Sequence, residues 1–340
     1  FIEDSTLIIA HFRVNVQKKK MTWRLFLLGL VVLTEWCRAV PATVSVTSAS
    51  PQSYAVLKTS NQSVLYGLTL PDNVTYRETQ PFVTKLKGTR FQIGYDYASL
   101  LASETSYTLS TFMNSTTSNA TVQRSFLTFA TYLWDHYYVK YIPAGFLEEL
   151  RGMDAWYQDA VSSGTLPSDV EHAPSNVTRW FNVLANMPAD PQNIISAMED
   201  EIEHGWPKWL KDIVNEIISV LENLGHHCDA YGVWGSRTVG GRLYTSRNLD
   251  YNSNTGINKY KNVIVYEIQD PVLVIPPYAS IGFTFGLGAL AGINMAGITT
   301  SEMNLDNSRT TFSGVPFPMR LRYVLEGATN LETAMTLWNH

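Results

Sequence analysis

The chain has 340 residues, of which 45% are hydrophobic, and it carries a formal net charge of −5. A chain of this length and composition can bury a core in one large domain or two smaller ones, so we expect a globular protein. The negative charge, and the lack of a Lys/Arg-rich block after the first few dozen residues, exclude the electrostatic footprint of a nucleic-acid-binding protein.

The N-terminal region has the features of a secretory signal. Residues 1–20 show no periodicity and are interpreted as sequence upstream of the native start. After Met21, a basic Arg24 precedes a short apolar core and a small-residue exit at Ala39 or Ala42, so residues 21–39 are predicted to be a signal peptide. The apolar core is too short to span a bilayer, which disfavours the alternative of a membrane anchor. The predicted location is secreted or lysosomal.

The segment 40–227 is interpreted as a glycosylated N-terminal part, either a small subunit or a propeptide. Behind a signal peptide, Asn-x-Ser/Thr sequons predict N-glycosylation on surface loops. Five sequons are present, and all precede residue 228: Asn61, Asn73, Asn114, Asn119 and Asn176.

Short strands and turns are expected from Ala42 to Val83, followed by helices. Helical spacing begins after residue 88 and recurs over 124–141, where an aromatic stripe is assigned to the core. One or two helical turns are expected within 142–153. An amphipathic helix is predicted over 209–224, ending at Gly225, because helix C-termini favour a residue without a Cβ.

β-like runs recur after residue 228 and predict a sheet, with turns such as Gly240-Gly241 between the strands. The runs are 230–234, 243–247, 263–268, 272–275 and 281–285. Helical spacing returns at 319–326, and Thr329-x-x-Glu332 has the pattern of a capping box opening another helix. The sequence ends at residue 340, where that helix would still be shorter than a typical globular helix. Residues 228–340 are therefore interpreted as the first part of a domain truncated at its C-terminus.

Cys228 is expected to be the only cysteine of the mature chain, because Cys37 lies in the predicted signal peptide. A thiol attacks only as the thiolate, and a cysteine with an ordinary pKa of about 8.5 needs a nearby base or cation. If the His227–Cys228 bond is cut, the freed α-amine has a pKa of about 7.7–8.0 and can accept the thiol proton. The predicted exposed link at residues 226–227 is the kind of segment where chains are cut.

An Arg-Asn-x-Asp cluster at the end of the next predicted strand supplies candidate partners for the thiol. In a hairpin, Arg247 would lower the thiol pKa and hold a substrate oxygen, and Asp250 would orient the α-amine. Asn304 is a candidate amide donor to an oxyanion. Each has a structural alternative, namely a buried inert thiol, a surface ion pair of Arg247 with Asp250, and an ordinary loop asparagine.

Neither a metal site nor a cofactor site is predicted. The run His-His-Cys-Asp at 226–229 consists of adjacent residues, which rarely converge on one ion, and no second Cys/His pair is present in the sequence. The glycine run Gly286-x-Gly288-x-x-x-Gly292 has the wrong spacing for a dinucleotide loop and is assigned to turns.

The run from Cys228 to Tyr251 resembles the N-terminal-nucleophile cysteine amide hydrolases, in which a cysteine opens one strand and Arg-Asn-x-Asp ends the next. The similarity is greatest to the branch containing isopenicillin N acyltransferase. Acid ceramidase, N-acylethanolamine amidase and choloylglycine hydrolase share the core of that family. Further similarities lie at 88–95, 142–152, 292–304 and 314–332.

The resemblance implies an α+β fold, a four-layer αββα sandwich, made as a zymogen that cleaves itself between His227 and Cys228. It implies Cys228 as nucleophile, Arg247 and Asp250 as its partners, and Asn304 as an oxyanion donor. The implied activity is hydrolysis of linear amide bonds, or acyl transfer, through a cysteine thioester. The implied partners are a small N-acyl or lipid-like amide and the cleaved N-terminal segment as a second subunit, with no cofactor.

Two alternatives remain open. The family usually has hydroxyl residues directly after the cysteine, where this chain has Asp229 and Ala230, which favours a secreted binding glycoprotein that is never processed. The other alternative is a lipid esterase of the phospholipase B-like type, which shares the fold and the cysteine nucleophile.

Overall fold

The computed structural model describes residues 53–69, 82–170, 191–221, 227–250, 255–284, 286–302 and 311–339. All of them belong to one compact unit, Ser53–His340. Residues 1–52, which include the predicted signal peptide, lie outside the described residues. The same holds for three of the candidate site residues named above: Asn73, Asn176 and Asn304.

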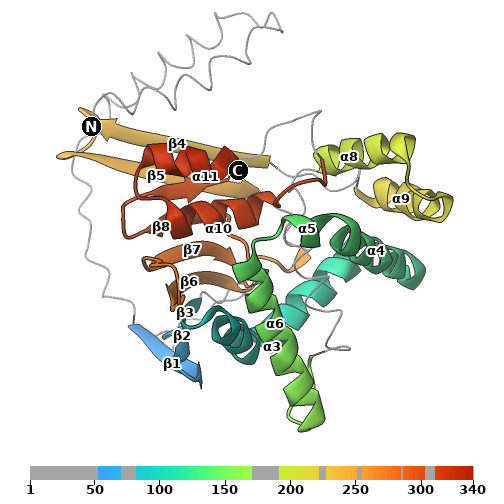
Figure 1. The fold of residues 1–340 in the computed structure, drawn as a ribbon, viewed down its shortest axis with the longest axis horizontal. Helices are drawn as coiled ribbons and strands as arrows, with labels where there is room; N and C mark the ends of the chain where they lie inside the picture. The colour runs from blue at the N-terminus through green and yellow to red at the C-terminus, as the bar shows by residue number, and fades with distance from the viewer. Residues whose placement is uncertain are drawn as a thin grey trace, which may run out of the picture. The chain divides into compact units, whose positions relative to one another are not determined.

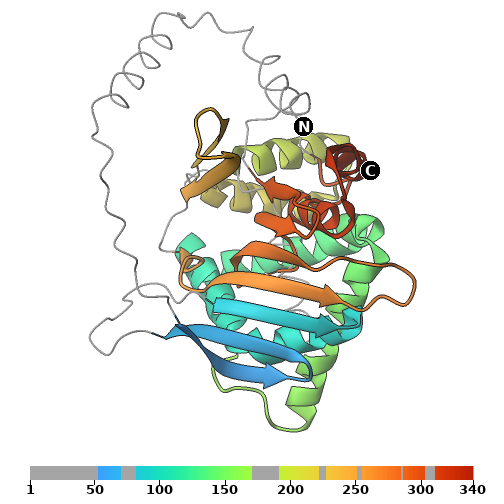
Figure 2. The same cartoon turned by 90° about the vertical axis from the view of Figure 1, so that its left-hand side faces the viewer.

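The centre of the unit is a seven-stranded sheet (Figures 1 and 2). Neighbouring strands pair antiparallel except β3 and β6, which run parallel. This parallel pair joins a strand that precedes residue 228 to one that follows it. In spatial order the strands are β1 (Ser53–Ser60), β2 (Ser63–Thr69), β3 (Phe82–Gly88), β6 (Lys261–Ile268), β7 (Tyr278–Phe283), β8 (Ala291–Asn294) and β9 (Thr299–Ser301).

The two faces of the sheet differ in burial. Along β3 and β6 the side chains alternate between buried and half-buried positions. Because successive side chains of a strand point to opposite faces, one face forms the core and the other is partly open. The open face carries the ion pair Lys85–Glu267, with an N–O distance of 2.7 Å.

Helices cover the buried face, and Figure 2 shows them behind the sheet. Helix α3 (Arg90–Thr116) follows β3 directly and begins with a capping box formed by Thr89 and Gln92. Helix α6 (Ala144–Ser162) packs along α3, and α10 (Phe317–Gly327) packs on β7, β8 and β9. The other described helices are α4 (Ala120–Leu133), the π-helical η2 (Trp134–Tyr138), α5 (Val139–Tyr141), α8 (Pro191–His204), α9 (Lys208–Leu221) and α11 (Leu331–Asn339).

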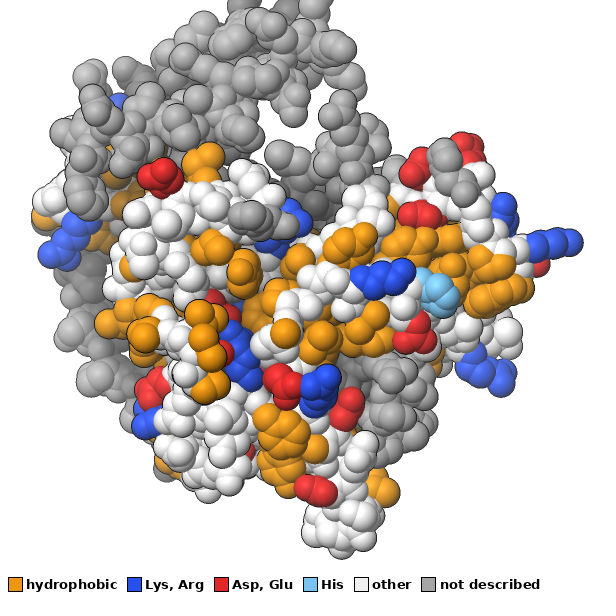
Figure 3. Space-filling model, in the orientation of Figure 1, with side chains coloured by type: hydrophobic (Ala, Val, Ile, Leu, Met, Phe, Trp, Pro, Cys, Tyr) orange, Lys and Arg blue, Asp and Glu red, His pale blue; other side chains and the backbone are white. Residues whose placement is uncertain are grey.

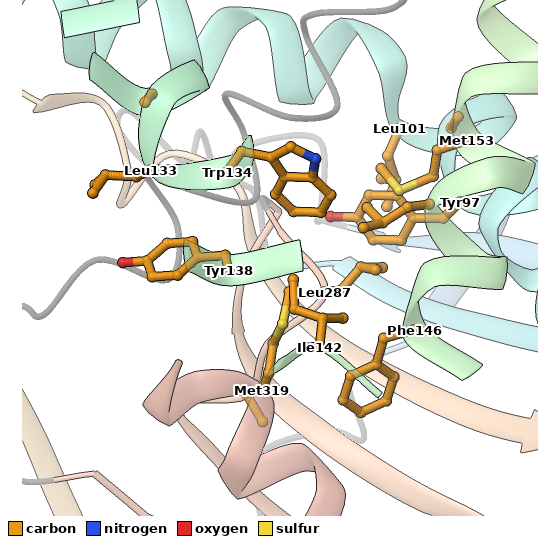
Figure 4. Packing of buried hydrophobic residues seen from close by; sticks show 14 of the residues in the cluster. Tyr97, Leu101, Leu133, Trp134, Tyr138, Ile142, Phe146, Met153, Leu287 and Met319 are labelled. Atoms are coloured by element: carbon orange, nitrogen blue, oxygen red, sulfur yellow. The ribbon is translucent and has the colours of Figure 1, made fainter. Parts of the chain in front are cut away.

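The core gathers side chains from both sides of residue 228. Figure 4 shows Met319 of α10 and Leu287 pointing toward Ile142, with Tyr97 of α3 and Phe146 of α6 near them. All five belong to one continuous cluster of buried hydrophobic residues. The core is therefore shared by the segments before and after the predicted cleavage point.

Most elements predicted from the pattern are confirmed. The aromatic stripe over 124–141 contributes Phe126 and Phe129 to the core, next to the aliphatic Leu133, and α9 is the predicted amphipathic helix. Within the run 142–153, residues 144–153 belong to a longer helix than expected, α6. The predicted helix end at Gly225 and the last residue of the run 281–285 lie outside the described residues.

Two local predictions are wrong. Residues 272–275 form a loop, because the Asp270 carboxylate accepts hydrogen bonds from the backbone N–H groups of Val272 and Leu273, both 2.9 Å, and flanking prolines supply no N–H for a ladder. The cap of α11 lies one residue later than predicted: Asn330 accepts from the N–H of Thr333 at 2.8 Å, and the Thr333 hydroxyl accepts from the N–H of Asn330 at 3.1 Å.

Helices α3 and α6 touch at two glycines. A Cβ on Gly94 would lie 1.7 Å from the backbone oxygen of Glu149, and a Cβ on Gly152 would lie 2.0 Å from the backbone oxygen of Phe91. Both obstacles are backbone atoms, so any larger residue would force the helices apart. This close approach fixes Glu149 over the start of α3, where Arg90 lies.

Candidate functional site

The predicted hairpin is present as a two-stranded antiparallel sheet of β4 (His227–Gly235) and β5 (Gly241–Asp250). Its turn contains Gly235, Gly240 and Gly241, with φ values of 63, 71 and 69°. Residues with a Cβ rarely adopt such values, so these glycines allow the chain to reverse here. The reversal brings the end of β5 back to the start of β4.

The pairing register places the backbone of Cys228 opposite Leu249 and that of Asp250 opposite His227. Arg247 lies opposite Ala230. Because residues two apart on a strand share a face, positions 228 and 247 are diagonal neighbours on one face of the hairpin. Position 250 pairs beside the His227–Cys228 peptide bond. The side chains at 228 and 250, like the whole of residue 304, lie outside what the structure describes.

Arg247 is bound by Glu302, the residue directly after β9. Its Nε donates to the backbone carbonyl of Glu302 at 2.9 Å, and its Nη2 donates to the carboxylate Oε2. The two side chains are 12% and 7% exposed, so this charge-assisted pair is largely shielded from water. Since β9 is the edge strand of the large sheet, the pair also ties the hairpin to that sheet.

Glu302 has one oxygen available. Among the described residues, its Oε1 is buried and has no hydrogen-bond partner, and the same is true of Thr300 Oγ1, two residues earlier. Burial raises the pKa of Glu302, and the Arg247 guanidinium opposes that shift without cancelling it. A buried polar atom without a partner is costly, so this oxygen is a candidate to contact a ligand or a neighbouring reactive group.

Replacing Glu302 by glutamine is expected to change how stability depends on pH. A carboxyl group whose folded pKa is raised stabilises the folded state below its unfolded pKa, near 4.5, and this contribution is lost as pH rises through the folded pKa. The free energy of unfolding of the native protein should therefore fall over that range relative to the Glu302→Gln variant. Denaturant titrations at several pH values measure the difference.

A matched control is Glu148→Gln, which removes an exposed ion pair with Arg151. Exposed pairs contribute little, so this variant should follow the native pH profile. A Glu302→Gln profile parallel to the native one would contradict the raised pKa.

Sequence reasoning missed Glu302. It directly follows the short strand β9, and nothing local in the sequence distinguishes it from a solvent-facing residue. Its partner Arg247 lies 55 residues away in the chain, so only the three-dimensional structure pairs them.

A second charged cluster lies inside the core. Arg322 is fully buried and donates two bonds of 2.7 Å to the two oxygens of Glu149. Its Nε donates to the Tyr278 hydroxyl at 2.7 Å, and that hydroxyl donates to Glu326 at 2.6 Å. Arg90 completes the cluster with bonds of 2.9 Å to Glu149 and 2.7 Å to Glu326.

This cluster joins three of the segments in which the resemblance was noted, around residues 88–95, 142–152 and 314–332. Burial alone would lower the pKa of Arg322, but the adjacent carboxylates, Glu149 first, outweigh it and raise the pKa. Glu149 and Glu326 balance Arg90 and Arg322 in charge, and Asp270 lies 3.9 Å from Arg90 at the edge of the cluster, so the arrangement is that of a structural brace. It connects α3 and α6 to β7 and α10.

Three of the predicted glycosylation sites lie on described residues, and all three are exposed. Asn61 lies in the β1–β2 turn, where its amide donates to the buried Asp96 at 2.6 Å. Asn114 lies in the last turns of α3, and Asn119 caps α4 by accepting from Thr121 N–H at 2.9 Å. Glycosylation at these positions stays a prediction.

Two other features are absent from the described ranges, a metal-binding cluster and a membrane-spanning helix. No group of three or more His, Cys, Asp or Glu side chains there is placed to hold a metal ion. None of the helices in that part of the chain is long and apolar enough to cross a membrane. On the face drawn in Figure 3, Lys and Arg side chains are scattered among hydrophobic and acidic ones.

Comparisons of the chain with protein-family models and with curated proteins find no match. A function for this chain must therefore be inferred from the hairpin, from its contact with Glu302 and from the chemistry of the residues placed there.

Proposed function

We propose that this chain is the precursor of a secreted or lysosomal amide hydrolase whose nucleophile is Cys228, freed by cleavage of the His227–Cys228 bond. The observation that supports this most directly is the hairpin register. It sets Asp250 beside the bond to be cut and Arg247 on the same face as position 228. A nucleophile, a charged group to orient the new amine and a cation thus occupy one end of a single hairpin.

The maturation step needs no other reactant than water. The Cys228 sulfur attacks the carbonyl carbon of His227, and the C–N bond breaks as the C–S bond forms, so the α-amine leaves with the thiol proton. Water then hydrolyses the thioester, which restores the thiol and leaves a carboxylate on His227. The free α-amine, with a pKa of about 7.7–8.0, becomes the base for later turnovers.

Hydrolysis of a substrate amide forms a C–S bond and breaks a C–N bond in the same way as the maturation step. The α-amine accepts the thiol proton, sulfur attacks the amide carbonyl, and the substrate amine leaves with a proton as the thioester forms. Water releases a carboxylic acid, or a second amine takes the acyl group in a transferase reaction. The Arg247 guanidinium, fixed by Glu302, is the group we assign to lowering the thiol pKa and binding the substrate oxygen.

The two pieces produced by the cut are expected to stay together as subunits. Strand β3, from the N-terminal piece, lies between β2 and β6 and pairs with β6 of the C-terminal piece over seven residues. The buried brace crosses the same boundary, because Arg90 and Glu149 precede residue 228 while Arg322 follows it. Separation would break the ladder and expose unpaired charges.

The full-length secreted protein, incubated at mildly acidic pH, should yield a fragment that begins at Cys228, as shown by intact mass and N-terminal sequencing. Both fragments should co-elute in native size-exclusion chromatography and separate only in denaturant. A single uncut chain would contradict the proposal and favour a binding glycoprotein. Release of fatty acid from a phospholipid, with none from an amide, would favour the lipid esterase.

A further inference from the structure

We propose that two neighbouring turns of the large sheet form one apolar tip that dips into the surface of a lipid bilayer. The turns are residues 271–277, between β6 and β7, and residues 295–298, between β8 and β9. Together they are called the apolar tip. None of these residues belongs to the hairpin or to its contact with Glu302, so binding to a membrane does not depend on the amidase activity proposed above.

The apolar tip exposes large hydrophobic side chains in an unbroken run. Val272, Leu273 and Val274 are 85, 61 and 97% exposed, and Met295 in the second turn is 76% exposed. Single exposed apolar residues are normal on protein surfaces, but consecutive ones mark a surface that another molecule covers. Figure 2 shows the loop between β6 and β7 extending beyond the end of the sheet.

The two turns lie next to each other on a fixed base. The backbone N–H of Met295 donates to the carbonyl of Pro277 at 3.3 Å. The strands that follow and precede the turns are paired, with Tyr278 opposite Asn294. Ile275, unlike the three residues before it, packs against the hydrophobic core. Only the exposed end of the apolar tip is therefore free to enter another phase.

The first turn satisfies most of its backbone donors without water. Its three prolines, at 271, 276 and 277, have no N–H. The Asp270 carboxylate accepts from the N–H groups of Val272 and Leu273, both at 2.9 Å. Val274 and Ile275 are the positions in this turn whose N–H groups have no such bond within the described residues.

The second turn satisfies all of its backbone donors. The side-chain oxygen of the buried Asn294 accepts from the N–H groups of Ala296 and Ile298, both at 3.0 Å. The backbone oxygen of Asn294 accepts from Gly297 at 3.0 Å, and the Met295 N–H bonds to Pro277 as described above. One asparagine thus organises this turn as one aspartate organises the other.

The satisfied donors favour lipid over a protein partner as the covering molecule. Water or a protein partner can bond an exposed N–H group, so neither requires a segment to satisfy its donors beforehand. Hydrocarbon offers no such bond, and a segment entering it must carry its own. Segments of this kind lie about 5–10 Å into the boundary of headgroups and acyl chains, where water still reaches the backbone carbonyl oxygens.

The charge around the apolar tip indicates which lipids it binds. The tip has no charged side chain, and the charge at its base, Asp270, is negative. The hydrogen bonds from Leu273 and Val272 lower the pKa of Asp270, which keeps it ionised at mildly acidic pH. Attraction to anionic headgroups therefore supplies no driving force, and binding to neutral lipid should change little with salt.

The test is sedimentation of the full-length protein with phosphatidylcholine vesicles. We expect Val274→Asp to lower the vesicle partition coefficient by about tenfold or more, because the charge keeps the apolar tip in water. Met295→Asp should lower it in the same direction. The matched control is Val239→Asp in the β4–β5 turn, where Val239 is 91% exposed, and this variant should bind like the native protein.

Stability separates loss of binding from loss of fold. Val274 and Met295 are solvent-exposed, so both variants should unfold at the denaturant concentration of the native protein. Equal binding by Val274→Asp and Val239→Asp would overturn the proposal. So would binding that requires anionic lipid and disappears at high salt. A native protein that ignores vesicles but self-associates, unless Val274 is replaced by aspartate, would mean that a second copy covers the apolar tip instead.

Discussion

Replacing Cys228 by alanine is expected to leave the full-length protein as one uncut chain and to lower the proposed amide hydrolysis by at least about a thousandfold. Two losses occur together, because the variant lacks the sulfur that attacks and never frees the α-amine that would accept its proton. Intact mass shows the missing cut, and hydrolysis of an N-acyl amide at the same pH measures the missing activity.

A matched control replaces a residue of the same hairpin that has no role in the proposed reaction. Ser246 is exposed and lies opposite Tyr231, on the face away from position 228. Ser246→Ala should be cut and active like the native protein. Full amidase activity in Cys228→Ala would eliminate the cysteine mechanism.

The hairpin was predictable because its causes are local. Alternating residues on either side of Gly240-Gly241 specify two strands and a turn, and antiparallel pairing then follows from chain reversal. The pattern could place Arg247 and Asp250 near Cys228 in the backbone without any long-range information. The contact of Arg247 with Glu302 was not predictable, because it depends on how the hairpin meets the edge of a separate sheet.

The prediction of a strand at residues 272–275 is wrong for a physical reason. Val272, Leu273 and Val274 read as a strand by hydrophobicity, yet they are 85, 61 and 97% exposed. One carboxylate, that of Asp270, satisfies two backbone N–H groups locally and so removes the need for a strand partner. Side-chain capping of this kind outweighs the preference of β-branched residues.

The segments in which the family resemblance was noted contribute residues to one buried cluster in the fold. In the sequence, Arg90, Glu149, Arg322 and Glu326 are scattered over more than two hundred residues. In the structure they share one buried cluster, and Gly94 lets Glu149 approach α3. Spacing along the chain could not distinguish such a brace from catalytic residues, because both are polar groups in otherwise apolar surroundings.

Replacing Arg322 by methionine is expected to lower the free energy of unfolding by about 3–5 kcal/mol. Arg322 is fully buried and supplies both hydrogen bonds of 2.7 Å to Glu149, so its loss leaves buried negative charge in excess. Chemical denaturation measures the effect. In the cleaved protein, the two pieces should also separate at a lower denaturant concentration. Lys85→Met, which removes a partly exposed ion pair with Glu267, is the control and should cost at most about 1 kcal/mol.

A double variant tests whether the cost comes from unpaired charge or from lost packing. Removing Glu149 together with Arg322, as Glu149→Leu with Arg322→Met, leaves Arg90 and Glu326 as a complete pair at 2.7 Å, still joined to Tyr278. If unbalanced charge dominates, the double variant should be destabilised less than the sum of the single variants, by about 1–3 kcal/mol. Strict additivity would mean that packing around each side chain carries the effect. Side-chain packing would then stabilise the brace, and charge balance would not be the interaction that joins the two proposed subunits.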